Sequence, residues 1–180
     1  MKKTCYEDKQ KYPQVFIPYD FHNDSKCFQN LEIPIPKKAS SSVSKKGASE
    51  DHFKAYLVKY FSNQISSELE LVLGDWLPKV PDFVLSDLDN KIFIDIEIDE
   101  PYSINDGTLF HYHGKDCDRN FTFIYNNWFV VRFTEEQVLK TPNECCQLVK
   151  QFVDYIAARL KGKAVTWQNN FQHIDESWSE

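Results

Sequence analysis

The chain has 180 residues, of which 42% are hydrophobic and 15% aromatic, and its formal net charge is −6. This composition supports one folded domain with a hydrophobic core and excludes a disordered chain. No apolar run approaches the roughly 20 residues of a membrane-spanning helix, and no apolar stretch follows the charged start MKKTCYEDKQKYPQ, as a secretory signal would require. We therefore predict a soluble, cytoplasmic protein without membrane contact. The negative net charge argues against a protein that binds nucleic acid over its whole surface.

The cysteines predict reduced thiols. They show no regular spacing and no CxxC pair, so neither a disulfide framework nor a zinc ribbon is indicated. The five positions are Cys5, Cys27, Cys117, Cys145 and Cys146.

Composition divides the chain into three segments. Residues 1–46 are predicted to form an N-terminal arm, with short proline-containing edge strands at 14–20 and 31–36 and a basic Ser/Lys linker at 37–46. Residues 47–160 are predicted to form the core. Residues 161–180 are an aromatic tail that either docks a protein partner, as the arm could also do, or packs on the domain; its large side chains are Trp167, Phe171 and Trp178.

The first half of the core predicts a helix and two strands. A helix begins at Ser49, a candidate cap, and carries apolar residues at spacings of three and four. Residues 65–77 are predicted to be the end of that helix followed by a second, short one. Strands are predicted at 83–85 and 91–99, joined by a turn at 87–90.

The second half predicts a loop, a helix, a buried strand and a last helix. Residues 101–120 are polar and are predicted to be a functional loop leading into a helix at 116–125. WFVVRF (128–133) is a buried strand, Thr134 caps a short helical turn, and 143–160 is a helix with an apolar stripe. This order predicts an α/β fold, specifically an α/β/α sandwich around a central mixed sheet.

The strand KIFIDIEID alternates strictly. Its four isoleucines fall on one face, and Asp95, Glu97 and Asp99 fall on the other, roughly 7 Å apart in succession. Repulsion makes this acidic face costly unless it is solvated or a cation neutralises it. Hard oxygen ligands favour Mg²⁺ or Mn²⁺ over zinc. The alternative is an ordinary exposed strand face.

Two sequence features next to the acidic strand favour a metal site over an ordinary exposed strand face. Pro81-Asp82 opens the preceding strand, and a hairpin would bring Asp82 beside the carboxylates. Glu100-Pro101 then ends the acidic strand sharply.

Pro81-Asp82, followed by Asp95-Ile96-Glu97 on the next strand, resembles the PD-(D/E)XK nuclease superfamily. The upstream helix adds Glu50, similar to the helix glutamate that many members use as a further metal ligand. The segment DRNFTFIYNNWFVVRFTEEQV (118–138) resembles the very-short-patch-repair-endonuclease-like branch. The resemblance covers about residues 47–160 and implies a restriction-endonuclease-like fold that hydrolyses phosphodiester bonds.

The chain departs from this superfamily at its signature lysine. That position is Glu97 in the register Asp95/Glu97 and Asp99 in the register Glu97/Asp99, and the sequence leaves both registers open. A metal-bound water can attack without a lysine. Alternatively, Lys91, Lys115 or a loop histidine assists.

The resemblance implies a site that holds Mg²⁺ or Mn²⁺ and cleaves DNA. The expected metal ligands are Asp82, Glu97, Asp95, Asp99 and Glu50, with Glu50 equally able to serve as a first-turn charge of its helix. The histidines His111 and His113 are expected to help at the phosphate, or to be ordinary loop residues. The candidate nucleic-acid contacts are Lys115, Arg119, Lys45 and Lys46.

Two arginines have structural alternatives. Arg119 either reaches a phosphate or forms an ion pair. Arg132 interrupts a buried strand and predicts a salt bridge with Glu135 or Glu136.

These observations favour a divalent-metal-dependent DNA endonuclease of a repair, transposition or phage-defence system. The second hypothesis is a catalytically inactive nuclease-fold subunit that binds a protein or nucleic acid, which the missing lysine and the acidic charge favour. A third is an unrelated α/β domain, in which Asp82 and Glu97 would not meet.

Overall fold

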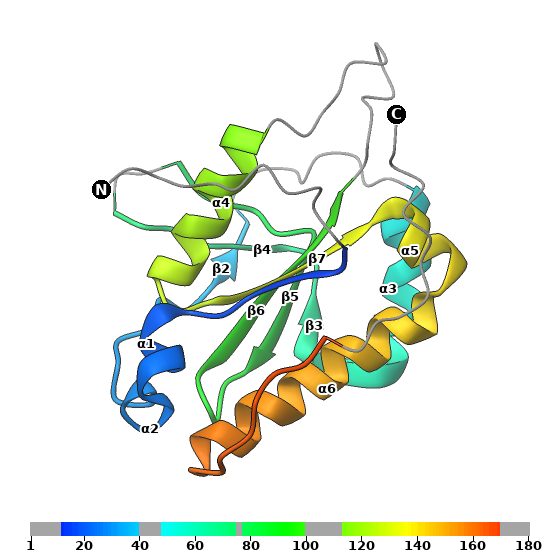
Figure 1. Cartoon of the computed structure of the whole chain (residues 1–180). Helices are drawn as coiled ribbons and strands as arrows, with labels where there is room; N and C mark the ends of the chain where they lie inside the picture. Colours follow the sequence, from blue (N-terminus) through cyan, green and yellow to red (C-terminus); the bar gives the residue numbers. More distant parts are fainter. Residues whose placement is uncertain (1–11, 40–47, 75–76, 100–112, 170–180) are drawn as a thin grey trace.

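The computed structural model describes residues 12–39, 48–74, 77–99 and 113–169 (Figure 1). A mixed sheet lies at the centre, with helices around it. The elements in chain order are β1 Gln14–Phe16, α1 Tyr19–Asn23, α2 Ser25–Phe28, β2 Lys37–Lys38, α3 Ala48–Phe61, the 3-10 helix η1 Ser62–Gln64, β3 Ile65–Ser66, β4 Leu69–Glu70, β5 Phe83–Asp87, β6 Ile92–Asp99, α4 His113–Tyr125, β7 Phe129–Thr134, α5 Glu135–Lys140 and α6 Pro142–Leu160.

The central sheet has five strands in the order β1-β7-β6-β5-β3. β6 and β7 are parallel and are connected through α4, whereas the other neighbouring pairs are antiparallel. β2 and β4 form a separate antiparallel pair. The prediction of an α/β fold with a mixed sheet is confirmed.

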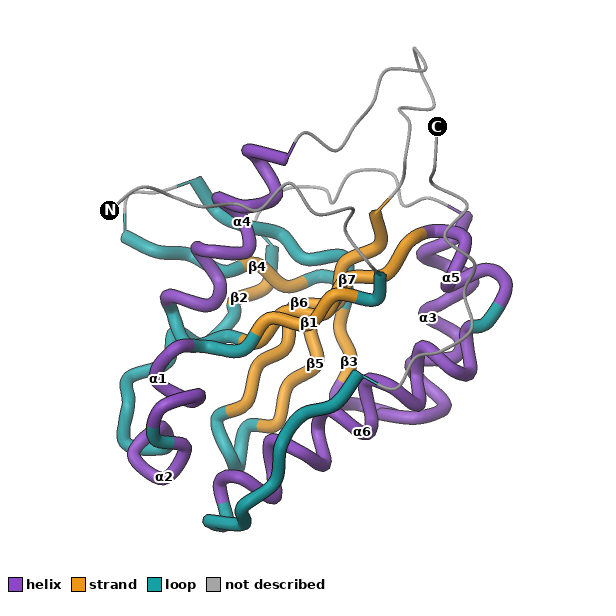
Figure 2. Tube along the Cα trace, in the orientation of Figure 1, coloured by secondary structure: helices purple, strands orange, loops and turns teal. Residues whose placement is uncertain are grey.

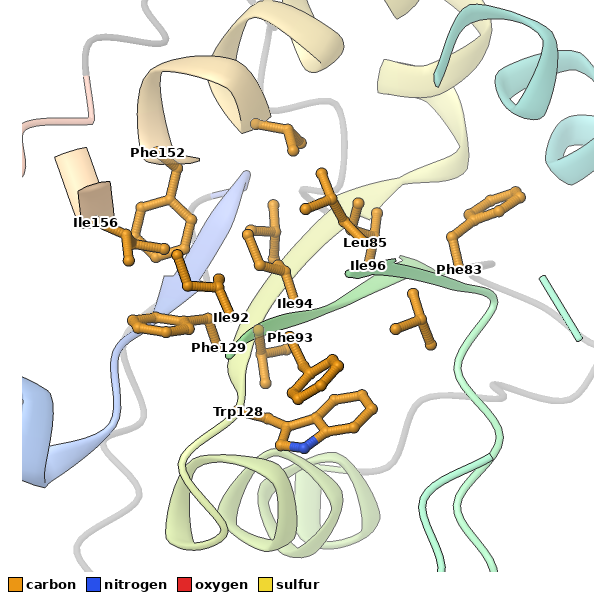
Figure 3. Close-up of a cluster of buried hydrophobic side chains, with 14 of the residues drawn as sticks. Phe83, Leu85, Ile92, Phe93, Ile94, Ile96, Trp128, Phe129, Phe152 and Ile156 are labelled. Atoms are coloured by element: carbon orange, nitrogen blue, oxygen red, sulfur yellow. The ribbon is translucent and has the colours of Figure 1, made fainter. Parts of the chain in front are cut away.

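The isoleucine face of β6 is core, as its alternation predicts. Ile92, Ile94 and Ile96 are fully buried. Figure 3 shows them on the same side of the sheet as Phe152 and Ile156 of α6. Burial of several large apolar side chains on this face supplies a major part of the folding free energy.

The opposite face of β6 is buried as well, beneath α4. Phe93 stacks on Trp128 at a ring-centroid distance of 5.1 Å, and Trp128 in turn contacts Phe123 of α4. Figure 3 shows Phe93 and Trp128 on the side of the sheet away from α6. The carboxylates of this face therefore lie in a covered layer and are not exposed on an open strand face.

The N-terminal residues 14–28 pack into the same core. β1 pairs with β7 at the edge of the sheet, which confirms an edge strand for Gln14–Phe16, whereas Tyr19 and Asp20 belong to α1. Phe21 is fully buried and lies edge-on to Phe28 and Phe129. At 31–36 the predicted strand is wrong, because this stretch has no strand and β2 begins only at Lys37.

Two predictions about the remaining elements are wrong. Residues 65–77 contain no helix among those described; β3 pairs with β5, β4 pairs with β2, and these tertiary partners override local helix propensity. Ser49 lies inside α3, which begins at Ala48, and its buried Oγ has no partner among the described residues. The helix predicted at 116–125 is present as α4, which begins at His113 and ends at Tyr125.

The C-terminal half follows its sequence signals closely. Thr134 and Gln137 form a reciprocal capping box at the start of α5, as the capping prediction required. The predicted stripe of α6, from Leu148 to Leu160, is buried. Trp167 packs on Phe152 and Tyr155, so this tail residue covers its own domain. Figure 2 shows the loop that follows α6 running back along that helix. Phe171 and Trp178 lie outside the described residues.

The described thiols are free cysteines, at Cys27, Cys145 and Cys146. Burial raises the pKa of Cys145 and also that of Cys146, the latter to about 12, so both are unreactive as thiolates at neutral pH. Within the described ranges, none of the helices combines the length and apolar character needed to cross a membrane.

Candidate functional site

The acidic residues meet where β5 begins and β6 ends. The antiparallel register pairs Phe83 with Ile96, so Asp82, one residue earlier, comes opposite Glu97. The Ile98 backbone N–H donates to Oδ2 of Asp82 at 2.7 Å, which fixes this carboxylate across the hairpin. The predicted convergence of Asp82 and Glu97 is therefore present, and the reading in which they do not meet is wrong.

Asp82 occupies an environment that disfavours its charge. Burial raises the pKa of this carboxyl well above its usual value, and the charges of Glu97 and Glu50 raise it further. The Ile98 hydrogen bond and Arg119 oppose the rise without cancelling it. Glu50, at the start of α3, is near enough to Asp82 for its charge to act on that carboxyl.

Asp95 is the most unusual side chain of this group. It is fully buried, and neither of its carboxylate oxygens has a hydrogen-bond donor among the described residues. Burial raises its pKa well above the usual value, and the Glu97 carboxylate raises it further. A buried acceptor of this kind costs about 1–3 kcal/mol relative to a satisfied one, so it needs a proton or a cation to compensate.

Arg119 of α4 supplies positive charge to the group. Its Nη2 donates to Oε1 of Glu97 and, at 2.7 Å, to the backbone carbonyl of Val80. Burial alone would lower the pKa of the guanidinium, but the Glu97 and Asp95 carboxylates outweigh burial and raise it. Arg119 therefore stays charged next to the carboxylates. Its buried Nε has no acceptor among the described residues.

Asp99 belongs to a different, closed network. Arg132 donates to both of its oxygens, from Nη2 to Oδ1 and from Nε to Oδ2 at 2.9 Å. The Tyr12 hydroxyl adds a bond to Oδ2 at 2.5 Å, and Nη1 of Arg132 donates to Asn120 at 2.9 Å. Asp99 thus serves as the partner of a buried arginine.

These contacts separate the two registers that the sequence leaves open. Asp95 and Glu97 lie with Asp82 and Arg119, whereas Asp99 is held by Arg132. The predicted partners of Arg132, Glu135 and Glu136, are wrong. The parallel register places Arg132 next to β6, and its guanidinium bonds Asp99 there.

The acidic face is neutralised differently from the prediction. Solvation is excluded, because Asp95, Glu97 and Asp99 are all buried. Two arginines from α4 and β7 balance part of the charge. Asp95 feels the charges of both arginines but has no hydrogen-bond donor among the described residues.

The remaining predicted site residues are only partly placed. His111, Lys45 and Lys46 lie outside the described residues, and for His113 and Lys115 the description covers the backbone of α4 alone. Lys91 lies just before β6, at the opposite end of the strand from Glu97, so it cannot assist at this site.

Within the described ranges, no three His, Cys, Asp or Glu side chains are arranged as a ready set of metal ligands. The donor chemistry of the acidic group nevertheless fits a hard divalent cation, since it consists of carboxylate oxygens. The two oxygens of Asp95 lack any other partner. Glu97 is already in an ion pair with Arg119, and this pair would have to change before Glu97 could bind a metal.

Three contributors were missed in the sequence. Tyr12 and Asn120 complete the Asp99–Arg132 network, and Val80 supplies a carbonyl to Arg119. Tyr12 and Val80 carry no local signal. Asn120 could have been found, because a buried arginine such as Arg132 needs several acceptors.

Comparison with known proteins gives no relative from which to transfer a function: no protein-family model, curated protein or solved structure matches the chain.

Proposed function

We propose that this protein is a divalent-metal-dependent nuclease, with Asp82, Asp95 and Glu97 as its acidic group, on a restriction-endonuclease-like α/β/α sandwich. The observation that carries the proposal is the fully buried Asp95, which has no hydrogen-bond donor among the described residues and lies near the charge of Glu97. Burying several carboxylates together lowers the stability of the fold. If these carboxylates had only a structural role, each would be expected to have a hydrogen-bond donor for every oxygen, as Asp99 has.

The cation would be held by Asp95, Asp82 and Glu97, with Glu50 near Asp82. Three carboxylates against the single guanidinium of Arg119 leave a deficit of positive charge that one divalent cation balances. Mg²⁺ and Mn²⁺ suit these oxygen donors. When bound in such a site, a cation of this kind polarises a phosphodiester and lowers the pKa of water.

The residues of the chain prepare this chemistry. The hydrogen bond from Ile98 holds Asp82 in one orientation across the β5–β6 hairpin. α4 covers the carboxylates and so excludes bulk water, which strengthens every electrostatic interaction beneath it. The Asp99–Arg132 network ties β6, β7 and α4 together and keeps this cover in place.

Cleavage of plasmid DNA and of labelled oligonucleotides, with Mg²⁺ or Mn²⁺, tests the proposal. The variants are Asp82→Asn and Glu97→Gln, which keep the size of the side chain and one acceptor oxygen while removing the charge. We expect cleavage by the wild type and a loss of roughly a hundredfold or more in either variant, the scale of removing one group that stabilises charge in the transition state.

Asp51→Asn is the matched control, because Asp51 is an exposed carboxylate on α3 next to Glu50. It should cleave like the wild type. Equal cleavage by wild type, Asp82→Asn and Glu97→Gln would contradict the proposal, provided circular dichroism shows all proteins folded.

A second function has its own observation in support. Glu97 and Asp99 are already paired with arginines, so two of the three strand carboxylates are neutralised without a metal. This favours a catalytically inactive nuclease-fold subunit that binds a protein or nucleic-acid partner. DNA binding without cleavage under any divalent cation would support it over the enzyme.

A further inference from the structure

A cluster of positive charge lies where α2 packs against the end of α6. Lys26 of α2 lies on Gly162, since a Cβ atom added to this glycine would be 2.8 Å from Cε of Lys26 and 3.5 Å from its Nζ. Lys161 and Lys163 flank the same glycine, and all three lysines are exposed. Arg159, in the last turn of α6, adds a fourth cation. We call these four side chains the basic patch.

The backbone beneath the basic patch is fixed by hydrogen bonds. Gly162 has a φ of +75°, a left-handed conformation that glycine adopts readily, and its N–H donates to the Arg159 carbonyl at 2.9 Å. The same carbonyl accepts from the Ser25 hydroxyl at 3.0 Å, and Nη2 of Arg159 donates to the His22 carbonyl at 3.3 Å. These bonds join the end of α6 to α1 and α2, so the lysines of both segments are held at one place on the surface.

The positive charge of the basic patch exceeds the negative charge beside it. Lys26, Lys161 and Lys163 make no ion pair with any described residue. Asp24, whose carboxylate caps α2, contributes one negative charge near Lys26. The negative end of the α6 dipole contributes about half a charge. Four cations exceed both together, in a chain whose net charge is −6, so the patch is suited to an anion from outside the chain.

We propose that the basic patch binds the sugar–phosphate backbone of nucleic acid. Lysine ammonium groups act as point charges that neutralise phosphates without reading bases. A protein partner is disfavoured, because lysine is depleted in protein–protein interfaces, where aromatic residues and arginine are enriched. The inference deepens the proposed function, on which it rests for the choice of nucleic acid as the polyanion.

The basic patch lies away from the acidic group of Asp82 and Glu97. Figure 1 shows α2 and the end of α6 at the opposite end of the sheet from the end of β6, where these two carboxylates meet. β6 has eight residues and is therefore about 26 Å long, which corresponds to roughly eight base pairs of duplex. The patch is thus a second contact, which binds phosphates other than the one at the acidic group.

Fluorescence anisotropy with a labelled duplex of about 20 base pairs, in EDTA and at 50 to 200 mM NaCl, tests this inference. The patch variant combines Lys26→Met, Lys161→Met and Lys163→Met. Each phosphate contact contributes about 0.9 to the slope of log affinity against log salt concentration, so the slope of this variant should be smaller than that of the wild type by about two to three. Its affinity at 50 mM NaCl should fall by roughly tenfold or more.

The matched control removes three exposed lysines elsewhere, on α3, α5 and α6, and so lowers the net charge by the same amount. It combines Lys59→Met, Lys140→Met and Lys150→Met, and it should keep the wild-type slope to within about one half. Circular dichroism confirms that each variant is folded. The single variant Lys163→Met covers the case in which the patch variant unfolds, and its slope should be smaller than the wild-type slope by about 0.9.

Several results would overturn the inference. The slopes of the folded patch variant and the wild type could be equal, or the patch variant and the control could lose the same slope and affinity. The wild type could also bind the duplex more weakly than about 100 µM at 50 mM NaCl, below ordinary non-specific affinity. Binding to phosphatidylserine vesicles without any duplex binding would assign the patch to a membrane surface instead.

The outcomes separate this inference from the proposed function. Duplex binding that depends on the patch, by a wild type that does not cleave with Mg²⁺ or Mn²⁺, would sustain the inference and remove the nuclease activity. Cleavage by the wild type, together with an unchanged salt slope in the patch variant, would sustain the nuclease and remove the role of the patch.

Discussion

Two groups of carboxylates and arginines lie beneath α4, and they differ in how completely their polar atoms are hydrogen-bonded. We call the group of Asp99 and Arg132 the closed group, and the group of Asp95, Glu97 and Arg119 the open group. Around Asp99 every oxygen has a donor, from Arg132 and Tyr12, and the network is sealed from solvent. Around Asp95 the pattern differs: its two oxygens have no donor, and Nε of Arg119 has no acceptor, among the described residues. Both groups lie on one face of β6, where Asp95 and Asp99 are four residues apart. The first is therefore interpreted as structural, and the second as a site that awaits ligands.

The sharpest way to test the closed group is to remove its arginine. Arg132→Met leaves Asp99 buried with only part of its donors, which should lower the free energy of unfolding by about 3–5 kcal/mol. Urea denaturation measures this. Replacing both partners, as Arg132→Met with Asp99→Leu, should recover much of the loss, because no buried charge is stranded. A loss below about 1 kcal/mol in the single variant would contradict the structural role.

The same change in the open group should cost less. Arg119 is partly exposed, and water can replace part of what Glu97 loses, so Arg119→Met should lower the free energy of unfolding by about 1–2 kcal/mol. The experiment is the same urea titration, without divalent cations. If Arg119→Met proved as destabilising as Arg132→Met, the distinction between the two groups would fail.

Replacing Asp95 should change the free energy of unfolding in the opposite direction. Its pKa is raised on folding, so the folded state binds more protons than the unfolded state, and stability falls as pH rises from the usual carboxyl pKa through the raised one. Asp95→Asn removes this penalty and should stabilise the metal-free protein by on the order of 1 kcal/mol at neutral pH. Melting temperatures from pH 4 to 8 in EDTA should then decline less steeply than in the wild type. Destabilisation at pH 8 would show that the charged carboxylate has a partner after all.

The smallest effect belongs to the exposed ion pair on α6. Lys150→Met removes the contact with Asp154, which lies at helical spacing on the surface, and should change the free energy of unfolding by less than about 0.5 kcal/mol. The unfolding midpoint should stay within error. A larger change would mean that loss of surface charge, and not burial, explains the stability changes expected for the Arg132, Arg119 and Asp95 variants.

The fold could be predicted where local periodicity and caps decide the structure. Strand β6 follows its strict alternation, Thr134 caps α5, and the apolar stripe of α6 is buried. The failure at 65–77 has a tertiary cause, because Ile65 and Leu69 belong to strands whose partners lie elsewhere in the chain. No local window contains that information.

Only part of the site could be predicted from the sequence. The spacing of Asp82 and Glu97 indicated a hairpin that joins them, and the register confirms it. Which carboxylates belong together could not be predicted, because Arg132 reaches Asp99 through a parallel pairing and Tyr12 reaches it from 87 residues away. The choice between Asp95 and Asp99 therefore depends on contacts that only the folded chain creates.

Calorimetric titration of Mn²⁺ into the wild type, Asp95→Asn and Arg132→Met tests the central claim most directly. The account predicts that the wild type binds Mn²⁺. It predicts a loss of roughly tenfold or more in affinity for Asp95→Asn, because that variant lacks one of the proposed metal ligands. A folded Arg132→Met should bind with near-normal affinity, because Arg132 is not part of the proposed metal site. Equal affinity of Asp95→Asn and wild type, or no Mn²⁺ binding by the wild type, would contradict it.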